Sequence, residues 1–152
     1  MFRFVAVISV FLFVCSALLA CAGSHPAHLG ISDSGLAPCP SSPNCVSSDD
    51  QDKNHKVLPL QLAAAPADAW QAVRELVLAL PRTRIVDETA DYLHAECRTL
   101  LGFVDDLELH LRPAEGIIAV RSASRLGYSD LGVNRRRVEG LRAALSSRNI
   151  VK

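Results

Sequence analysis

Apolar and polar positions change rhythm several times along this chain, and each rhythm predicts an element. Between Ala65 and Pro81 large apolar side chains recur every three or four positions, which is the period of one helix face. They are Trp70, Val73, Leu76, Val77 and Leu80. Pro66 suits the first turn of a helix, and Pro81 ends the pattern. The segment therefore predicts an amphipathic helix.

The middle of the chain alternates with period two, which is typical of strands. The alternation is clear in residues 93–99 and again in 107–112, and a turn at 113–116 leads into a third strand over 117–125. One face of this antiparallel sheet is apolar, and we expect the other face to be exposed to solvent. Cross-strand charge pairs are expected there, drawn from Glu96, Arg98, Glu108, Arg112 and Arg121.

Shorter strands are expected at 57–62 and 85–86, and a second helix from about Asn134. Val138, Leu141 and Leu145 mark the inner face of that helix, and Asn134 is a good N-cap residue. The order is β-α-β-β-β-β-α. It predicts an α+β fold in which two helices cover one face of an antiparallel sheet of about four or five strands.

The first twenty residues indicate export. After the single charge of Arg3, an apolar run continues to Ala20, and it is short for a spanning helix, which needs roughly 20 residues. The segment Leu18-Leu19-Ala20-Cys21 resembles a bacterial lipobox. That resemblance implies a lipoprotein signal peptide over 1–20 and a diacylglyceryl group, with chains such as palmitate, on the Cys21 thiol. An ordinary cleaved signal or an uncleaved anchor are the alternatives.

Residues 21–55 are rich in Ser, Pro, Gly, Asp and His, and they predict a lipidated tether followed by an irregular loop. The α+β domain is expected over 56–152. Because an exported chain meets oxidising conditions, the close pair Cys39 and Cys45 is the expected disulfide. Cys97 is expected to be a buried thiol. No metal site is expected, because the cysteine spacing matches no CxxC pattern.

Charge and motifs exclude several classes of function. The chain has 16 basic and 16 acidic residues, and loss of Arg3 with the leader leaves 15 basic residues. A nucleic-acid partner is not expected from this balance. The sequence holds no GxSxG, HExxH, Walker or dinucleotide motif, so no cofactor is expected and an enzyme is the less favoured interpretation.

Residues 121–135 hold the most informative polar cluster: Ser122, Ser124, Arg125, Tyr128, Asp130, Asn134 and Arg135. The two serines are expected to face the helices, where they either line a cavity or allow close helix packing. Arg125, Tyr128 and Arg135 either clamp a carboxylate or phosphate at a helix N-terminus or belong to a structural network with Asp130.

Three segments together resemble the domain-of-unknown-function family 1499, whose members occur in bacterial envelopes and in plastids. They are Pro38-Cys39-Pro40-Ser41-Ser42-Pro43-Asn44-Cys45-Val46-Ser47-Ser48, Phe103-Val104-Asp105-Asp106, and the run from Arg121 to Arg135. The resemblance covers roughly residues 36–146. It implies no catalytic residues.

We therefore expect a lipoprotein anchored to a membrane of the bacterial envelope and facing the periplasm. Its domain is expected to be a non-enzymatic binding or structural module whose partner is an envelope protein or a small amphipathic ligand. A carrier of such a ligand is one alternative. The other is a hydrolase acting on envelope material through Asp130, Ser122 or His110.

Overall fold

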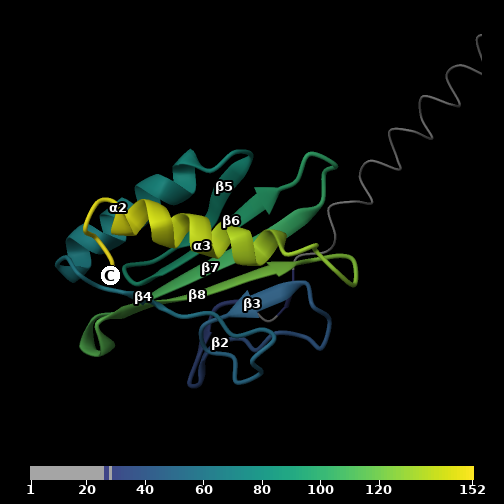
Figure 1. Ribbon diagram of the computed structural model, residues 1–152, viewed down its shortest axis with the longest axis horizontal. Helices are drawn as coiled ribbons and strands as arrows, with labels where there is room; N and C mark the ends of the chain where they lie inside the picture. Colours follow the sequence, from purple (N-terminus) through teal and green to yellow (C-terminus); the bar gives the residue numbers. More distant parts are fainter. Residues whose placement is uncertain (1–25, 28) are drawn as a thin grey trace, which may run out of the picture.

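The structure, a computed structural model, describes residues 26–27 and 29–152 (Figure 1). The predicted signal peptide and the lipidation site Cys21 lie outside these residues. The elements follow in the order β1 (Ile31–Ser32), β2 (Gly35–Leu36), β3 (Cys45–Ser47), β4 (Leu60–Gln61), α2 (Pro66–Ala79), β5 (Thr83–Glu88), β6 (Tyr92–Arg98), β7 (Val104–Arg112), a 3₁₀ turn (Pro113–Glu115), β8 (Ile117–Ser124) and α3 (Val133–Ser146).

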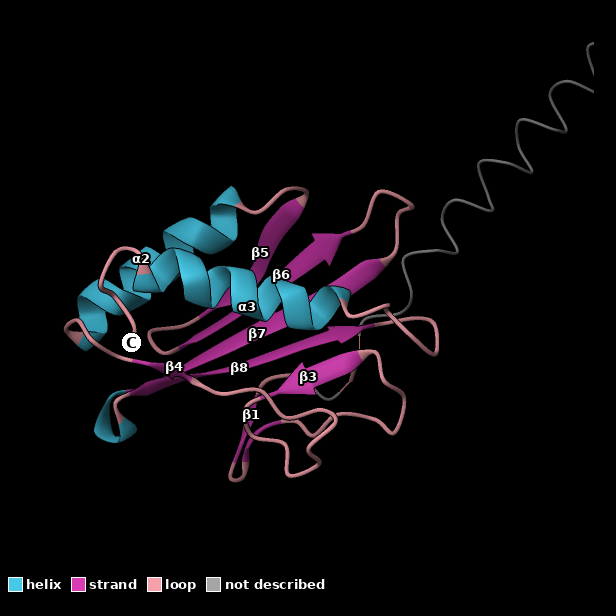
Figure 2. Cartoon of the chain, in the orientation of Figure 1, coloured by secondary structure: helices cyan, strands magenta, loops and turns pink. Residues whose placement is uncertain are grey.

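Both helices lie on one face of an antiparallel sheet, which confirms the predicted α+β class (Figure 2). The sheet has six strands in the order β3-β8-β7-β6-β5, with β4 also paired to β8. The predicted count of four or five strands was too low. The extra strand is β3, which comes from the segment expected to be a loop and pairs with the end of β8.

The helices form where the apolar spacing predicts them. In α2 the buried side chains are Ala69, Val73 and Val77, one turn apart. The helix α3 begins after Gly132, whose positive φ of 77° suits glycine. Asn134, expected as the N-cap, lies instead within the first turn, and its side chain is buried. Among the described residues, no helix is long and apolar enough to cross a membrane.

The main core fills the space between the two helices and the sheet. Leu93, Leu107, Leu109 and Ile118 point from the sheet toward the helices and are fully buried, together with Leu145 of α3. Burying one such side chain contributes about 1.5–3 kcal/mol to folding. This apolar layer holds the helices at a fixed height above the strands.

The second face of the sheet, predicted to be exposed, is buried at its centre. Glu108 is 0% exposed and Arg121 is 3% exposed, although they pair across strands as expected, at 2.8 Å. The chain on either side of β3 covers this face: before β3 the backbone N–H of Gly30 donates to Glu108, and after β3 Asp49 pairs with Arg112. A tether-like composition concealed this role, because the segment binds through backbone and carboxylate groups and has little apolar periodicity.

The disulfide between Cys39 and Cys45 is present, with the two Cα atoms 5.6 Å apart. This confirms the expected pairing. Cys45 opens β3, and the N–H of Cys39 donates to the carboxylate of Asp50 at 2.8 Å. The bridge therefore fixes the loop that leads into the outermost strand next to β8.

Candidate ligand-binding site

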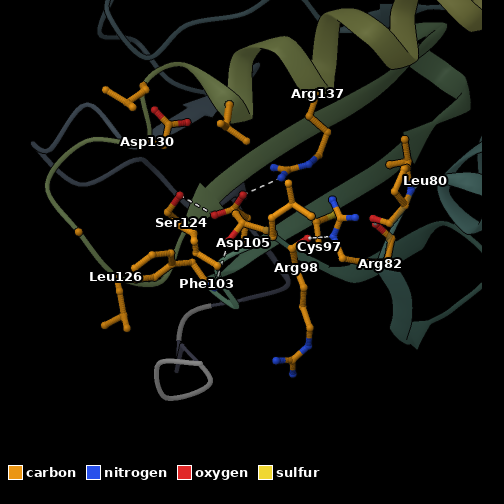
Figure 3. Close-up of a pocket in the computed structure, with 18 of the residues that line it drawn as sticks. Leu80, Arg82, Cys97, Arg98, Phe103, Asp105, Ser124, Leu126, Asp130 and Arg137 are labelled. Carbon is orange, nitrogen blue, oxygen red and sulfur yellow. Dashed lines mark hydrogen bonds and ion pairs between the residues drawn. The ribbon is translucent and has the colours of Figure 1, made fainter. Parts of the chain in front are cut away.

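A cavity of about 690 Å³ opens at the end of the sheet where α2 ends and α3 begins (Figure 3). Its walls come from the start of β5, the β6–β7 loop, the β8–α3 loop and the first turn of α3. Eight of the lining residues are apolar: Leu80, Pro81, Leu100, Leu101, Phe103, Leu126, Leu131 and Val133. This volume lies within the range of about 300–1,000 Å³ that small-molecule sites occupy.

An ion pair lies at the base of the cavity. Arg137 of α3 donates to the carboxylate of Asp105 at 2.6 Å, and Ser124 donates to the same carboxylate at 2.6 Å (Figure 3). Asp105 is 2% exposed. The cavity thus combines apolar walls with a small set of fixed donors and acceptors, which is the composition that orients an amphipathic ligand.

Asn134 holds this base together. Its side-chain oxygen accepts from Ser122 at 2.6 Å and from Arg137, while its amide donates to the carbonyl of Asn44 and to Ser124, both at 3.0 Å. Each polar group of this buried amide therefore has a partner, as buried polar groups require. The network ties α3 to β8 and to the residue that precedes β3.

The two serines face the helices as predicted, and they have different surroundings. Ser122 is fully buried beneath α3 and serves packing through its bond to Asn134. Ser124 lines the cavity.

Cys97 is the buried thiol that the sequence predicts, and it also lines the cavity. Burial raises the pKa of this thiol. The thiol therefore stays protonated at neutral pH and is a poor nucleophile, so its place in the wall suits contact with an apolar ligand.

Of the two alternatives for Arg125, Tyr128 and Arg135, the clamp does not form. Arg125 points to the second face of the sheet, and Tyr128 extends into solvent at 77% exposure. Arg135 donates to the backbone carbonyls of Lys56 and Asn54. Arg125, which follows the last residue of β8, and Arg135, in the first turn of α3, therefore bind different parts of the chain.

The Asp130 carboxylate binds neither Arg125 nor Arg135. Its two carboxylate oxygens accept the backbone N–H groups of Gly132 and Asn134, at 2.9 and 2.7 Å. The residue therefore satisfies free donors at the start of α3, where a negative charge is also favoured by the helix dipole. Its role is structural, at the edge of the cavity.

A separate buried network holds Arg125 on the second face. Its guanidinium binds both oxygens of Asp106, at 2.9 and 2.7 Å, and one oxygen of Glu96 at 2.8 Å. Burial alone would raise the pKa of both carboxyls. At Asp106 the hydrogen bonds from His94 and Arg125 outweigh this effect of burial, and at Glu96 those from Arg125 and Arg84 do the same. The pKa values of both carboxyls therefore lie below their ordinary values.

Asp105 and Asp106 are adjacent in the sequence, point to opposite faces of the sheet and are both buried. They lie in β7, where alternate side chains face the helices and the second face. Asp105 thereby enters the cavity base, and Asp106 enters the Arg125 network. Each carboxylate is compensated by an arginine.

The sequence analysis did not identify Arg137 as a residue of the site. Its side chain is only 11% exposed and points into the cavity base. A signal was present: Arg137 lies three residues after Asn134 and four before Leu141, which is the spacing of the inner stripe. The leucines of the β6–β7 loop were missed as well, because loop residues carry no periodic pattern.

The alternative hydrolase residues are not brought together. Ser122 faces the helices, whereas His110 lies on the second face and accepts a hydrogen bond from Arg112. Burial lowers the pKa of His110, and Arg112 lowers it further. Asp130 is bound to backbone N–H groups. Within residues 26–27 and 29–152, no group of three or more His, Cys, Asp or Glu side chains is placed to hold a metal ion.

Comparison with known proteins places the chain in a family. The model of a family described as a protein of unknown function, DUF1499, matches residues 35–145. No curated protein and no solved structure matches the chain. The matched span begins at β2 and ends in α3, so it includes the disulfide, the whole cavity and both buried networks.

Proposed function

The chain belongs to the DUF1499 family, whose description assigns no activity, and from its own geometry we propose that it binds a small amphipathic molecule in the cavity at the end of the sheet. The observation that carries the proposal is an open cavity of about 690 Å³ with apolar walls and a buried ion pair at its base. The ligand's apolar part contacts the walls, and its polar head meets Asp105 and Arg137. The role is binding without catalysis.

The charges of the lining residues favour a head that is neutral and polar or carries one negative charge. Three arginines line the cavity, Arg82, Arg98 and Arg137, against two carboxylates, Asp105 and Asp130. Asp130 is already engaged by two backbone N–H groups. A positively charged head would meet an excess of like charge, which disfavours it.

We place this binding module on the periplasmic face of a bacterial membrane, held by acyl chains on Cys21. The apolar leader, the lipobox-like segment and the Cys39–Cys45 disulfide support this location, because structural disulfides persist in oxidising compartments. Two or more acyl chains give stable anchoring, since each buried methylene adds roughly 0.8 kcal/mol.

Native mass spectrometry of protein purified from its own host in mild detergent is the first test. We expect a noncovalent species that is lost on denaturation, in addition to any covalent acyl mass that survives it. A second measurement follows the fluorescence of 11-(dansylamino)undecanoic acid, an amphiphile with one carboxylate, as it is added to the purified protein.

Matched tryptophan variants make the test specific to the cavity. Val133→Trp fills the cavity from the first turn of α3, and Val86→Trp adds the same bulk on the edge strand β5, away from it. We expect Val133→Trp to weaken probe binding by at least about tenfold and Val86→Trp to leave it unchanged. Equal affinities in the two variants, or no uptake of probe together with no noncovalent species, would overturn the proposal.

A further inference from the structure

Two loops at the mouth of the cavity expose large apolar side chains. In the β6–β7 loop Leu100 and Leu101 are 85% and 76% exposed, and in the β8–α3 loop Tyr128 and Leu131 are 77% and 84% exposed. Single exposed apolar residues are ordinary on protein surfaces. Here Leu100, Leu101 and Leu131 all line one cavity, so the three leucines form a group at one end of the molecule, and such groups mark interaction surfaces.

These loops carry almost no negative charge. Residues 99–103 hold no acidic side chain, and residues 126–132 hold only Asp130. The Asp130 carboxylate is occupied by the backbone N–H groups of Gly132 and Asn134. The surface at the cavity mouth therefore presents aliphatic tips without an exposed carboxylate that would oppose an anionic partner.

Arginines surround the same mouth. Arg82 and Arg98 line the cavity, and Arg136 lies in the first turn of α3; Arg82 and Arg136 donate to backbone carbonyls. At the opposite end of the sheet, the turns 88–91 and 113–116 hold three acidic residues between them. Positive charge therefore lies beside the exposed leucines, whereas these two turns at the other end of the strands hold no basic residue.

The chain between Gly30 and the proposed lipid anchor at Cys21 is long enough for the anchor to reach the exposed loops. The backbone of Gly30 meets Glu108 in the middle of β7, and Cys21 precedes Gly30 by nine residues, a span of at most about 30 Å. From Glu108 to Val104, at the cavity end of β7, the strand covers about 14 Å. An acyl group on Cys21 can therefore reach the plane of the exposed loops.

We propose that the cavity end docks on an anionic lipid surface, with Leu100, Leu101 and Leu131 entering the interface and Arg82 and Arg136 contacting the phosphates. Aliphatic tips beside arginines suit the boundary between headgroups and acyl chains. A second copy of the chain fits less well, because a two-fold contact would bring the same arginines together. Docked in this way, the cavity opens toward the lipid.

Tryptophan placed at the two ends of the molecule tests the docking. Leu101→Trp probes the exposed loop at the cavity mouth, and Ala114→Trp probes the exposed turn at the other end. Each variant is purified in its natural processed form and reconstituted into vesicles of phosphatidylcholine, with or without phosphatidylglycerol, that contain brominated acyl chains. We expect the tryptophan at position 101 to be quenched, more strongly with phosphatidylglycerol. The tryptophan at 114 should give no quenching beyond that of Trp70 in the unmodified protein.

Two variants that each remove one arginine, at opposite ends of α3, supply a matched control. Arg136→Gln removes a cation at the cavity mouth, and Arg148→Gln removes an exposed one beyond the other end of α3. We expect Arg136→Gln to lower the ratio of docked to undocked protein about fivefold and Arg148→Gln to leave it unchanged.

Two outcomes overturn the docking proposal. One is equal quenching at positions 101 and 114. The other is a blue shift of the tryptophan at 101 that rises with protein concentration in the absence of lipid, which would show that a second copy covers the loops. Probe binding in the cavity is measured without vesicles, so failure of the docking proposal and failure of the proposed function are separate results.

Discussion

Replacing Arg125 by methionine tests whether the buried network on the second face contributes to stability as its geometry implies. Methionine retains an unbranched side chain but removes the guanidinium that binds Asp106 through two bonds and Glu96 through one. Both carboxylates stay buried, at 2% and 5% side-chain exposure, with His94 still at Asp106 and with Arg84 and the more distant Arg98, at 3.5 Å, still at Glu96. Removing one partner of a buried pair costs about 3–5 kcal/mol.

That cost is a large part of the total, since domains unfold with about 5–15 kcal/mol. With a urea dependence of about 1–3 kcal/mol/M, the midpoint of unfolding should fall by at least about 1 M at neutral pH. The assay is urea unfolding followed by circular dichroism. Arg74→Met is the control, because its pair with Glu88 is 46% and 30% exposed and should contribute no more than about 1 kcal/mol.

The pH dependence makes the test specific to charge. In the natural protein the pKa values of Asp106 and Glu96 lie below their ordinary 3.8 and 4.5. The contribution of the two carboxylates to the free energy of unfolding is therefore complete above about pH 5, and it is lost as the pH falls through the pKa values of the folded state. In Arg125→Met the opposing effect of burial is no longer fully offset, which raises both pKa values. The variant's deficit should therefore shrink from pH 7 toward about pH 4. A deficit below about 1 kcal/mol at pH 7, or one that does not change with pH, refutes the reasoning.

Three further predictions concern the anchor, the disulfide and the cavity base. Cys21→Ser should move the protein from the membrane fraction to the soluble fraction, and continued pelleting would count against lipidation. Replacing Cys39 and Cys45 together by serine should lower the free energy of unfolding by less than about 3 kcal/mol, because the bridge closes a short loop; free thiols at both positions in the natural protein would contradict the bridge. Asp105→Leu combined with Arg137→Leu should leave stability unchanged or raise it by about 1–4 kcal/mol. The same double variant should weaken binding of the dansyl probe about tenfold or more, since a hydrogen bond to a charged group contributes about 1.5–3 kcal/mol; undiminished binding would show that the ion pair does not hold the ligand's head.

The helices and central strands followed from local pattern because their physical cause is local. The stripe of Val73 and Val77 and the alternation through Leu107 and Leu109 each reflect a single buried face. β3 and the covering segment were missed because backbone groups and carboxylates make their contacts, and those contacts depend on chain path. The N–H of Gly30 donating to Glu108 has no signature in the sequence.

The site was predicted only in part for a related reason. Ser122 and Ser124 interrupt an apolar alternation, so their inward position was visible in the sequence. Arg125 and Arg137 could not be assigned by charge alone, because arginine is ordinarily exposed. Which arginine meets which carboxylate depends on the register of β7 against β8 and on the rotation of α3, and both are tertiary properties.

The cavity lies where the inner faces of β7, β8 and α3 all change from apolar to polar residues. Along the helix-facing side of β7 the sequence passes from Leu109 and Leu107 to Asp105, and along β8 it passes from Val120 to the two serines. On α3 the inner stripe ends in Arg137 and Asn134. A buried ion pair is commonly less stabilising than apolar side chains of similar volume. Stability alone would therefore favour continuing the apolar core to the end of the sheet. The change to paired charges beneath an open apolar mouth accordingly favours a binding site over a gap left by imperfect packing.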